Sequence, residues 1–184
     1  MATIRRVRTV FEGVAGAPYY HSLYWPFVVS TEDAVSQTSD FWDVCNGVMD
    51  ASCTYNTDGV VVNIDATSGE PIGADVVDGI PGAGQVSGEI LSTALQVLIS
   101  TRTGVYVGGR EIRGRTFVPA LPVALTVDGV VDPGTVTGLS DDLATWLGGL
   151  ADPPVCWSRA HGQAATISAM TVWGQFAVLR SRRD

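Results

Sequence analysis

The sequence predicts one β-rich α+β domain over residues 1–184, an antiparallel sandwich or jelly-roll-like pair of sheets with two amphipathic helices packed against it. Three observations predict this class. Hydrophobic residues make up 46% of the chain and charged residues only 16%, which is typical of a compact globular protein. The 21 glycines follow no repeat period, so they indicate many turns between short strands. Most segments alternate apolar and polar residues as strands do, and two segments have apolar residues at the spacing of a helix.

The N-terminal segment predicts a strand. Residues 3–14 alternate apolar side chains with Arg5, Arg8 and other charged residues, so we expect a strand with one arginine-bearing face. Residues 52–65 combine β-branched side chains with the turn signal Asn56-Thr57-Asp58-Gly59, which predicts a hairpin with a four-residue loop.

Helical spacing appears twice. Apolar residues recur at helical intervals over residues 31–49, after the capping residue Ser30, with Asp33 three positions later. A second helix is predicted over residues 140–150, with Ser140 as its cap and two acids in its first turn.

The second half of the chain is expected to return to strands. Residues 96–119 hold the strongest strand signal, because β-branched and aromatic residues are punctuated by glycines and ended by a proline. Further strands are predicted at 123–131, 155–159 and 165–180, the last with a bulge at Gly174, and an exposed loop is predicted at 73–88.

Charge is distributed unevenly along the chain. The formal net charge is −8, and all eleven cationic residues are arginines. No arginine lies between Thr9 and Thr101, whereas twelve acids fall in that span. Because a net negative protein is repelled by phosphates and anionic lipids, we expect neither nucleic-acid contact nor membrane contact. The sequence also has no apolar run long enough to span a membrane.

The arginines are the main candidates for contacts between chains. If the basic segments are neighbouring strands, their guanidinium groups form a stripe. Three interpretations remain open: an internal ladder of ion pairs, a contact with the acidic part of another copy, or a contact with phosphates. The candidate residues are Arg5, Arg8, Arg102, Arg110, Arg113 and Arg115.

A dense aromatic segment over residues 19–27 offers a second candidate surface. Tyrosine and tryptophan favour positions with one apolar and one wet end, so these side chains fit either core and interface packing or a platform for a glycan or receptor. The candidate residues are Tyr19, Tyr20, Tyr24 and Trp25.

No catalytic or metal-binding pattern is present. The two histidines are His21 and His161, and the sequence contains neither a nucleophile motif nor a phosphate-binding loop. Cys45, Cys53 and Cys156 lack the spacing of a zinc site, so we expect buried thiols in a protein made in a reducing compartment. We therefore expect no enzymatic activity, no metal and no cofactor.

The run Arg102-Thr103-Gly104, followed by Gly109-Arg110-Glu111-Ile112-Arg113-Gly114-Arg115-Thr116-Phe117-Val118-Pro119, resembles a signature of small structural proteins of tailed bacteriophages and related viruses. The resemblance implies a virion protein made in the host cytoplasm, on the head or the tail, with copies of itself and other virion proteins as partners. We expect self-assembly or capsid decoration through the arginine-bearing strands. The alternative is a phage tail or surface module that binds a host receptor or glycan through the aromatic segment.

Overall fold

The structure is a computed structural model of the whole chain. It describes residues 3–12, 19–48, 54–73, 76–77, 95–103, 106–107, 110–111, 121–123, 132–158 and 162–173. The helices are α1 (Thr31–Asn46) and α2 (Pro133–Gly148). The strands are β1 (Thr3–Glu12), β2 (Tyr19–Pro26), β3 (Thr54–Asp65), β4 (Val76–Val77), β5 (Leu95–Thr103), β6 (Tyr106–Val107), β7 (Arg110–Glu111), β8 (Leu121–Val123), β9 (Val155–Ser158) and β10 (Gln163–Trp173).

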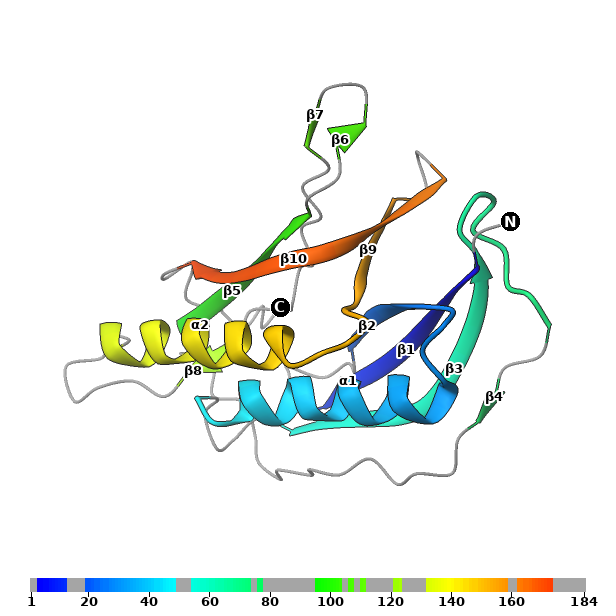
Figure 1. Ribbon diagram of the computed structural model, residues 1–184. Coiled ribbons are helices and arrows are strands. Elements are labelled where there is room, and N and C mark those ends of the chain that lie inside the picture. The colour runs from blue at the N-terminus through cyan, green and yellow to red at the C-terminus, as the bar shows by residue number, and fades with distance from the viewer. Residues whose placement is uncertain are drawn as a thin grey trace, which may run out of the picture.

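Eight of these strands form one antiparallel sheet in the order β4-β3-β1-β2-β9-β10-β5-β8, and β6 and β7 pair separately. The middle of the sheet is narrow, because β2 and β9 pair only at Tyr24 and Val155. The sheet changes direction there and bends around the two helices (Figure 1). The described part of the chain thus consists of a curved sheet and a helical layer.

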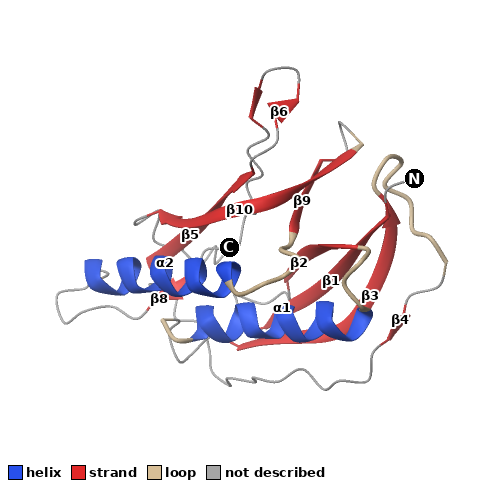
Figure 2. Ribbon diagram, in the orientation of Figure 1, coloured by secondary structure: helices blue, strands red, loops and turns tan. Residues whose placement is uncertain are grey.

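The helical layer covers one face of the sheet (Figure 2). Helix α1 packs against β1 and β3, α2 packs against β10, and the two helices contact each other. The α+β, sheet-rich class predicted from sequence is therefore confirmed. The described strands form one main sheet and one small separate pair, and they do not confirm the finer prediction of a sandwich or jelly roll.

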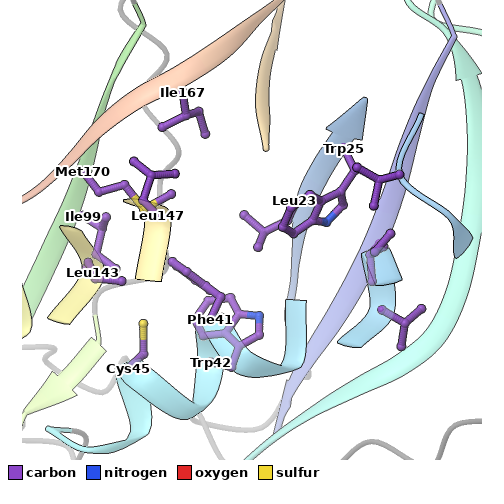
Figure 3. Close-up of a cluster of buried hydrophobic side chains, with 14 of the residues drawn as sticks. Leu23, Trp25, Phe41, Trp42, Cys45, Ile99, Leu143, Leu147, Ile167 and Met170 are labelled. Atoms are coloured by element: carbon purple, nitrogen blue, oxygen red, sulfur yellow. The ribbon is translucent and has the colours of Figure 1, made fainter. Parts of the chain in front are cut away.

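The main core lies between the sheet and the helices. Side chains from both parts of the sheet and from both helices converge there (Figure 3). Phe41 of α1 packs against Trp146 of α2 with ring centroids 5.2 Å apart, and Trp25 of β2 lies edge-on to the same indole at 6.3 Å. The core joins β1 near one end of the sequence to β10 near the other, so one hydrophobic cluster unites the fold.

Helix α1 begins as the sequence predicts. The Asp33 backbone N–H donates to Ser30 Oγ at 3.0 Å, and the Ser30 hydroxyl donates to Asp33 Oδ2 at 2.6 Å. This reciprocal cap satisfies an N–H group that the first turn leaves without a helical partner. The helix ends at Asn46, close to the predicted end at residue 49.

Helix α2 begins earlier than predicted. Asp132 is its N-cap and accepts from the Thr135 N–H at 2.9 Å, and Pro133 occupies the first helical position. Ser140, expected as the cap, lies inside the helix, where its hydroxyl donates to Val136 O and accepts from the Val172 N–H of β10. Glycines, threonines and valine in the first two turns are weak helix formers. For that reason the sequence did not indicate a helix there, although Asp-Pro is a typical helix start.

Residues 54–65 form one continuous strand instead of the predicted hairpin. Strand β3 pairs with β1 on both sides of Asn56–Gly59, and the register shifts between the pairs Val7–Val61 and Thr9–Thr57. The residues that were predicted to form a turn instead form an irregularity in the pairing of β1 with β3, with the extra residues on β3. The turn after β3 is present: Gly69 has φ 79°, and Asp65 Oδ1 accepts from the Thr67 N–H at 2.8 Å.

The described residues of the segment predicted as the strongest strand belong to three separate strands. Strand β5 ends at Thr103, and β6 and β7 then form a separate hairpin. The predicted strands at 155–159 and 165–180 correspond to β9 and β10, with a register shift between Ile167 and Ala169. β8 includes Val123, the first residue of the segment predicted at 123–131, and the rest of that segment lies outside the described residues. Gly174 and most of the loop expected at 73–88 lie outside the described residues.

The core contains one buried polar link whose removal should be costly. Trp25 Nε1 donates to Thr38 Oγ1 at 2.9 Å, and that hydroxyl donates to Ala34 O at 2.7 Å. We expect Trp25→Phe to lower the free energy of unfolding by about 3 kcal/mol, because it opens a cavity and leaves the hydroxyl without its donor.

Urea denaturation of Trp25→Phe, Thr38→Val and the double variant measures this link. Both side chains belong to one interaction, so the double variant should lose less stability than the sum of the single losses. Strict additivity would contradict a coupled hydrogen bond.

Candidate functional site

The arginines of β1 lie on two faces of the sheet. Arg5 alternates with Val7 and Thr9, which are buried beneath the helical layer. Arg6 and Arg8 occupy the intervening positions and therefore lie on the outer face, away from the helices. The expectation of one arginine-bearing face is wrong for Arg5, since odd and even positions of a strand point in opposite directions.

Arg5 holds the turn between β2 and α1. Its Nε donates to Val29 O at 2.6 Å, Nη1 donates to Asn63 Oδ1 at 2.8 Å, and longer bonds of 3.4 Å reach Phe27 O and Thr31 Oγ1. The guanidinium carbon also lies 4.4 Å from the centre of the Phe27 ring. Partial burial lowers the pKa of Arg5. These contacts assign Arg5 to an internal clamp.

The basic segments do not lie on neighbouring strands. Three strands, β2, β9 and β10, separate β1 from β5, which carries Arg102. Neighbouring strands are about 4.8 Å apart, so β1 and β5 lie roughly 19 Å from each other across the sheet. Arg110 belongs to the separate hairpin, and Arg113 and Arg115 lie outside the described residues. The continuous stripe expected from adjacent strands is therefore not formed by β1 and β5.

An aromatic pair accompanies the arginines of the outer face. Tyr24 of β2 pairs in register with Arg6 and with Val155. Its ring lies 5.7 Å from that of Trp157 on β9, and the Trp157 indole donates to Ala66 O at 2.9 Å. Burial raises the pKa of Tyr24, and the positive charge of Arg6 partly opposes that shift. Arg6 Nε has no hydrogen-bond partner. We call Arg6, Tyr24 and Trp157 the outer cluster.

The aromatic segment predicted as one surface is divided between the two faces. Trp25 is 0% exposed and belongs to the main core, so its assignment to a ligand platform is wrong. Tyr24 is half-buried on the outer face. The backbones of Tyr19 and Tyr20 belong to β2, but their side chains lie outside the described part of the structure. Alternation along β2 separates neighbouring aromatics just as it separates the arginines of β1.

The helical layer presents an acidic surface. Neither α1 nor α2 contains a lysine or an arginine. In α1, Glu32, Ser36, Asp40 and Asp43 follow one another at helical spacing on the solvent side. The exposed acids of the layer and its ends are Glu32, Asp33, Asp40, Asp43, Asp132, Asp141, Asp142 and Asp152. We call this surface the acidic helix face.

Several of these acids belong to the acidic part of the chain that the sequence offered as a contact for another copy, but none of them was selected as a site residue. Arg6 and Trp157 were likewise not selected as site residues. The period of two along β1 groups Arg6 with Arg8, and that signal was available. The pairing of β2 with β9, which brings Trp157 beside Tyr24, is a contact over more than 130 residues of sequence, and no local pattern predicts it.

Groups with nucleophilic or metal-binding chemistry do not gather at a site within the described ranges. Cys45 and Cys156 are buried thiols that form no disulfide, and burial raises the pKa of the Cys45 thiol far above its usual range. Among the described residues, no three metal-binding side chains come together. Cys53 and His161 lie outside those residues, as does the side chain of His21.

None of the helices that the structure describes combines the length and apolar character of a membrane span. Comparison with protein-family models, curated proteins and solved structures finds no match to this chain. The candidate site therefore rests on the geometry alone: an acidic helix face on one layer, and an outer sheet face carrying Arg6 and Arg8 on the other.

The clamp makes a testable prediction about Arg5. A lysine keeps the charge but cannot reproduce the forked geometry that joins three carbonyl or amide oxygens. We expect Arg5→Lys to reduce the free energy of unfolding by about 1–2 kcal/mol, measured by urea denaturation. An unchanged unfolding midpoint would show that the turn between β2 and α1 holds its shape without the guanidinium.

The acidic helix face makes a second prediction, about pH. Burial and then the neighbouring charge of Asp43 raise the pKa of Asp40. Because the folded state binds the proton more tightly than the unfolded state, the ionised carboxylate opposes folding above the folded-state pKa. That opposition disappears below the unfolded-state pKa.

Asp40→Asn should therefore stabilise the protein by about 0.3 kcal/mol at neutral pH, the size of a like-charge pair on a helix. The gain should vanish once the wild-type carboxyl is protonated. Urea denaturation of both proteins across the acidic range measures this difference, and a gain that persists at low pH would exclude the electrostatic cause.

Proposed function

We propose that this protein is a viral structural protein that assembles by placing the acidic helix face of one copy against the outer, arginine-bearing sheet face of the next. The carrying observation is the separation of charge between layers. Both helices carry exposed acids and contain no lysine or arginine, and Arg6 and Arg8 lie on the opposite side of the sheet. Complementary charge on opposite layers favours association in one orientation.

Contacts between unlike surfaces have a structural consequence. A head-to-tail contact leaves a free acidic face at one end and a free basic face at the other, so further copies can add. Such contacts close into rings when the rotation between copies permits it, and otherwise extend into filaments. Both outcomes suit a component of a particle or a tail.

The viral role itself is supported by the resemblance of residues 102–119 to the arginine- and glycine-rich signature of small phage structural proteins. With that role, the partners are copies of this chain and other virion proteins, and the location is the virion after synthesis in the host cytoplasm. Decoration of a capsid built from another protein would use the same charged faces. Arg102, Arg110, Arg113 and Arg115 are further candidates for these contacts.

The second candidate function is a tail or surface module that binds a host glycan or receptor. The observation that favours it is the outer cluster, because Tyr24 and Trp157 offer aromatic rings next to the guanidinium of Arg6. That arrangement suits an acidic sugar better than a neutral one, since Arg6 places a positive charge next to Tyr24. A glycan array of the wild type and Trp157→Ala tests it: loss of a retained ligand on substitution supports binding at this cluster.

Two charge reversals test the assembly. Asp141→Arg makes the helix face less acidic, and Arg8→Glu makes the sheet face less basic, so we expect each variant to associate more weakly with itself than the wild type does. A mixture of the two restores the attraction between the helix face of one and the sheet face of the other. Analytical ultracentrifugation at low salt measures each variant and the mixture.

Circular dichroism of each reversal variant provides the folding control for this experiment. The contact is electrostatic, so raising the salt concentration should weaken wild-type association. Wild-type protein that stays monomeric at all accessible concentrations would overturn self-assembly. Variants that fail to associate when mixed would overturn the pairing of these two faces.

A further inference from the structure

The turn between β2 and α1 carries two of the three exposed large hydrophobic residues in the described part of the chain. Phe27 is 52% exposed and Val28 is 73% exposed, although both adjoin the buried core residue Val29. Single exposed apolar residues are ordinary on protein surfaces, whereas two adjacent ones at a turn form a small protrusion. We call Phe27 and Val28 the apolar turn.

This turn is held in place from several sides. The Val29 N–H donates to Pro26 O at 3.1 Å, which closes the turn. Arg5 binds the carbonyls of Phe27 and Val29 and lies over the Phe27 ring. Ser30 then caps α1. A surface that is already ordered loses little conformational entropy when it binds, so its apolar area contributes more fully to affinity.

The position of the turn relates it to the acidic helix face. Arg5 lies on the helix side of the sheet, so its contacts place the turn on that side, directly before α1. The first turn of α1 adds the exposed acids Glu32 and Asp33. A matching partner must therefore offer an apolar surface next to a cation.

The outer cluster has that combination. Tyr24 and Trp157 form a half-buried aromatic pair, and the positive charge of Arg6, itself half-buried, lies next to Tyr24. An arginine beside aromatic rings is the composition found at the energetic centres of protein interfaces. The aromatic pair lies on the outer side of the sheet, opposite to the apolar turn, where it packs against a second cluster of buried residues: Ile4, Val62, Ile64, Ala66 and Val155.

We propose that the apolar turn of one copy docks on the outer cluster of a second copy, with Phe27 and Val28 against Tyr24 and Trp157 and with Glu32 close to Arg6. This inference rests on the proposed head-to-tail assembly and names the anchor of that contact. The charges supply the orientation, and the apolar turn supplies contact area that salt does not screen.

The anchor is tested by a matched pair of substitutions. Val28→Ser removes the most exposed apolar side chain, and we expect it to weaken self-association about tenfold. Ile72→Ser removes an apolar side chain that is 42% exposed after β3, and it should leave association unchanged. Analytical ultracentrifugation compares both variants with the wild type. Equal weakening by the two substitutions would overturn the proposal, because it would show a general effect of lost apolar surface.

A photo-crosslink tests the partner surface directly. A benzophenone amino acid at position 28 should crosslink between copies to the β9 peptide that contains Trp157 or the β2 peptide that contains Tyr24, as read by mass spectrometry. A crosslink to other peptides of the second copy overturns this docking. So does unchanged association of Val28→Ser, and in both cases the assembly itself remains if the paired charge reversals restore it. A wild type that stays monomeric overturns the assembly and this contact together.

Discussion

The structure depends on the alternation of side chains along β1 and β2, combined with a helical layer that covers only one face of the sheet. Alternation sends Arg5, Val7 and Trp25 toward the helices, and Arg6, Arg8 and Tyr24 to the other side. The same alternation places neighbouring residues of β2 in different environments. Trp25 builds the core, whereas Tyr24, its neighbour in sequence, contributes to a surface that another molecule can use.

Local chemistry predicted much of the fold. The Ser30 cap, the strand at the N-terminus and the apolar character of the two buried cysteines follow from patterns within a few residues. The hairpin expected at residues 52–65 is wrong because long pairing with β1 overrides a turn signal that a bulge can absorb. The early start of α2 was missed because Asp132-Pro133 precedes weak helix formers. Single-strand patterns also cannot reveal the strand order, which places β1 and β5 apart.

For the candidate surfaces, too, local sequence patterns predicted residue types, but not the contacts between distant segments. The sequence identified arginines as contact residues, but it could not assign Arg5 to a clamp whose partners lie 22 to 58 residues away. That clamp in turn shapes the exposed turn before α1. A residue predicted to make contacts between copies thus acts inside its own chain. Phe27 and Val28, which no charge pattern indicated, are exposed next to the acidic helix face, and we propose them as the anchor.

The central claim is that one copy uses two different faces, the helix layer and the outer side of the sheet, to contact its neighbours. Covalent footprinting of carboxyl groups and arginines at increasing protein concentration tests it most directly. The account predicts that labelling of Asp40 and Asp141 falls together with that of Arg6 and Arg8, while Arg5 stays equally protected at every concentration. Assembly that protects only one of the two faces, or neither, would contradict it.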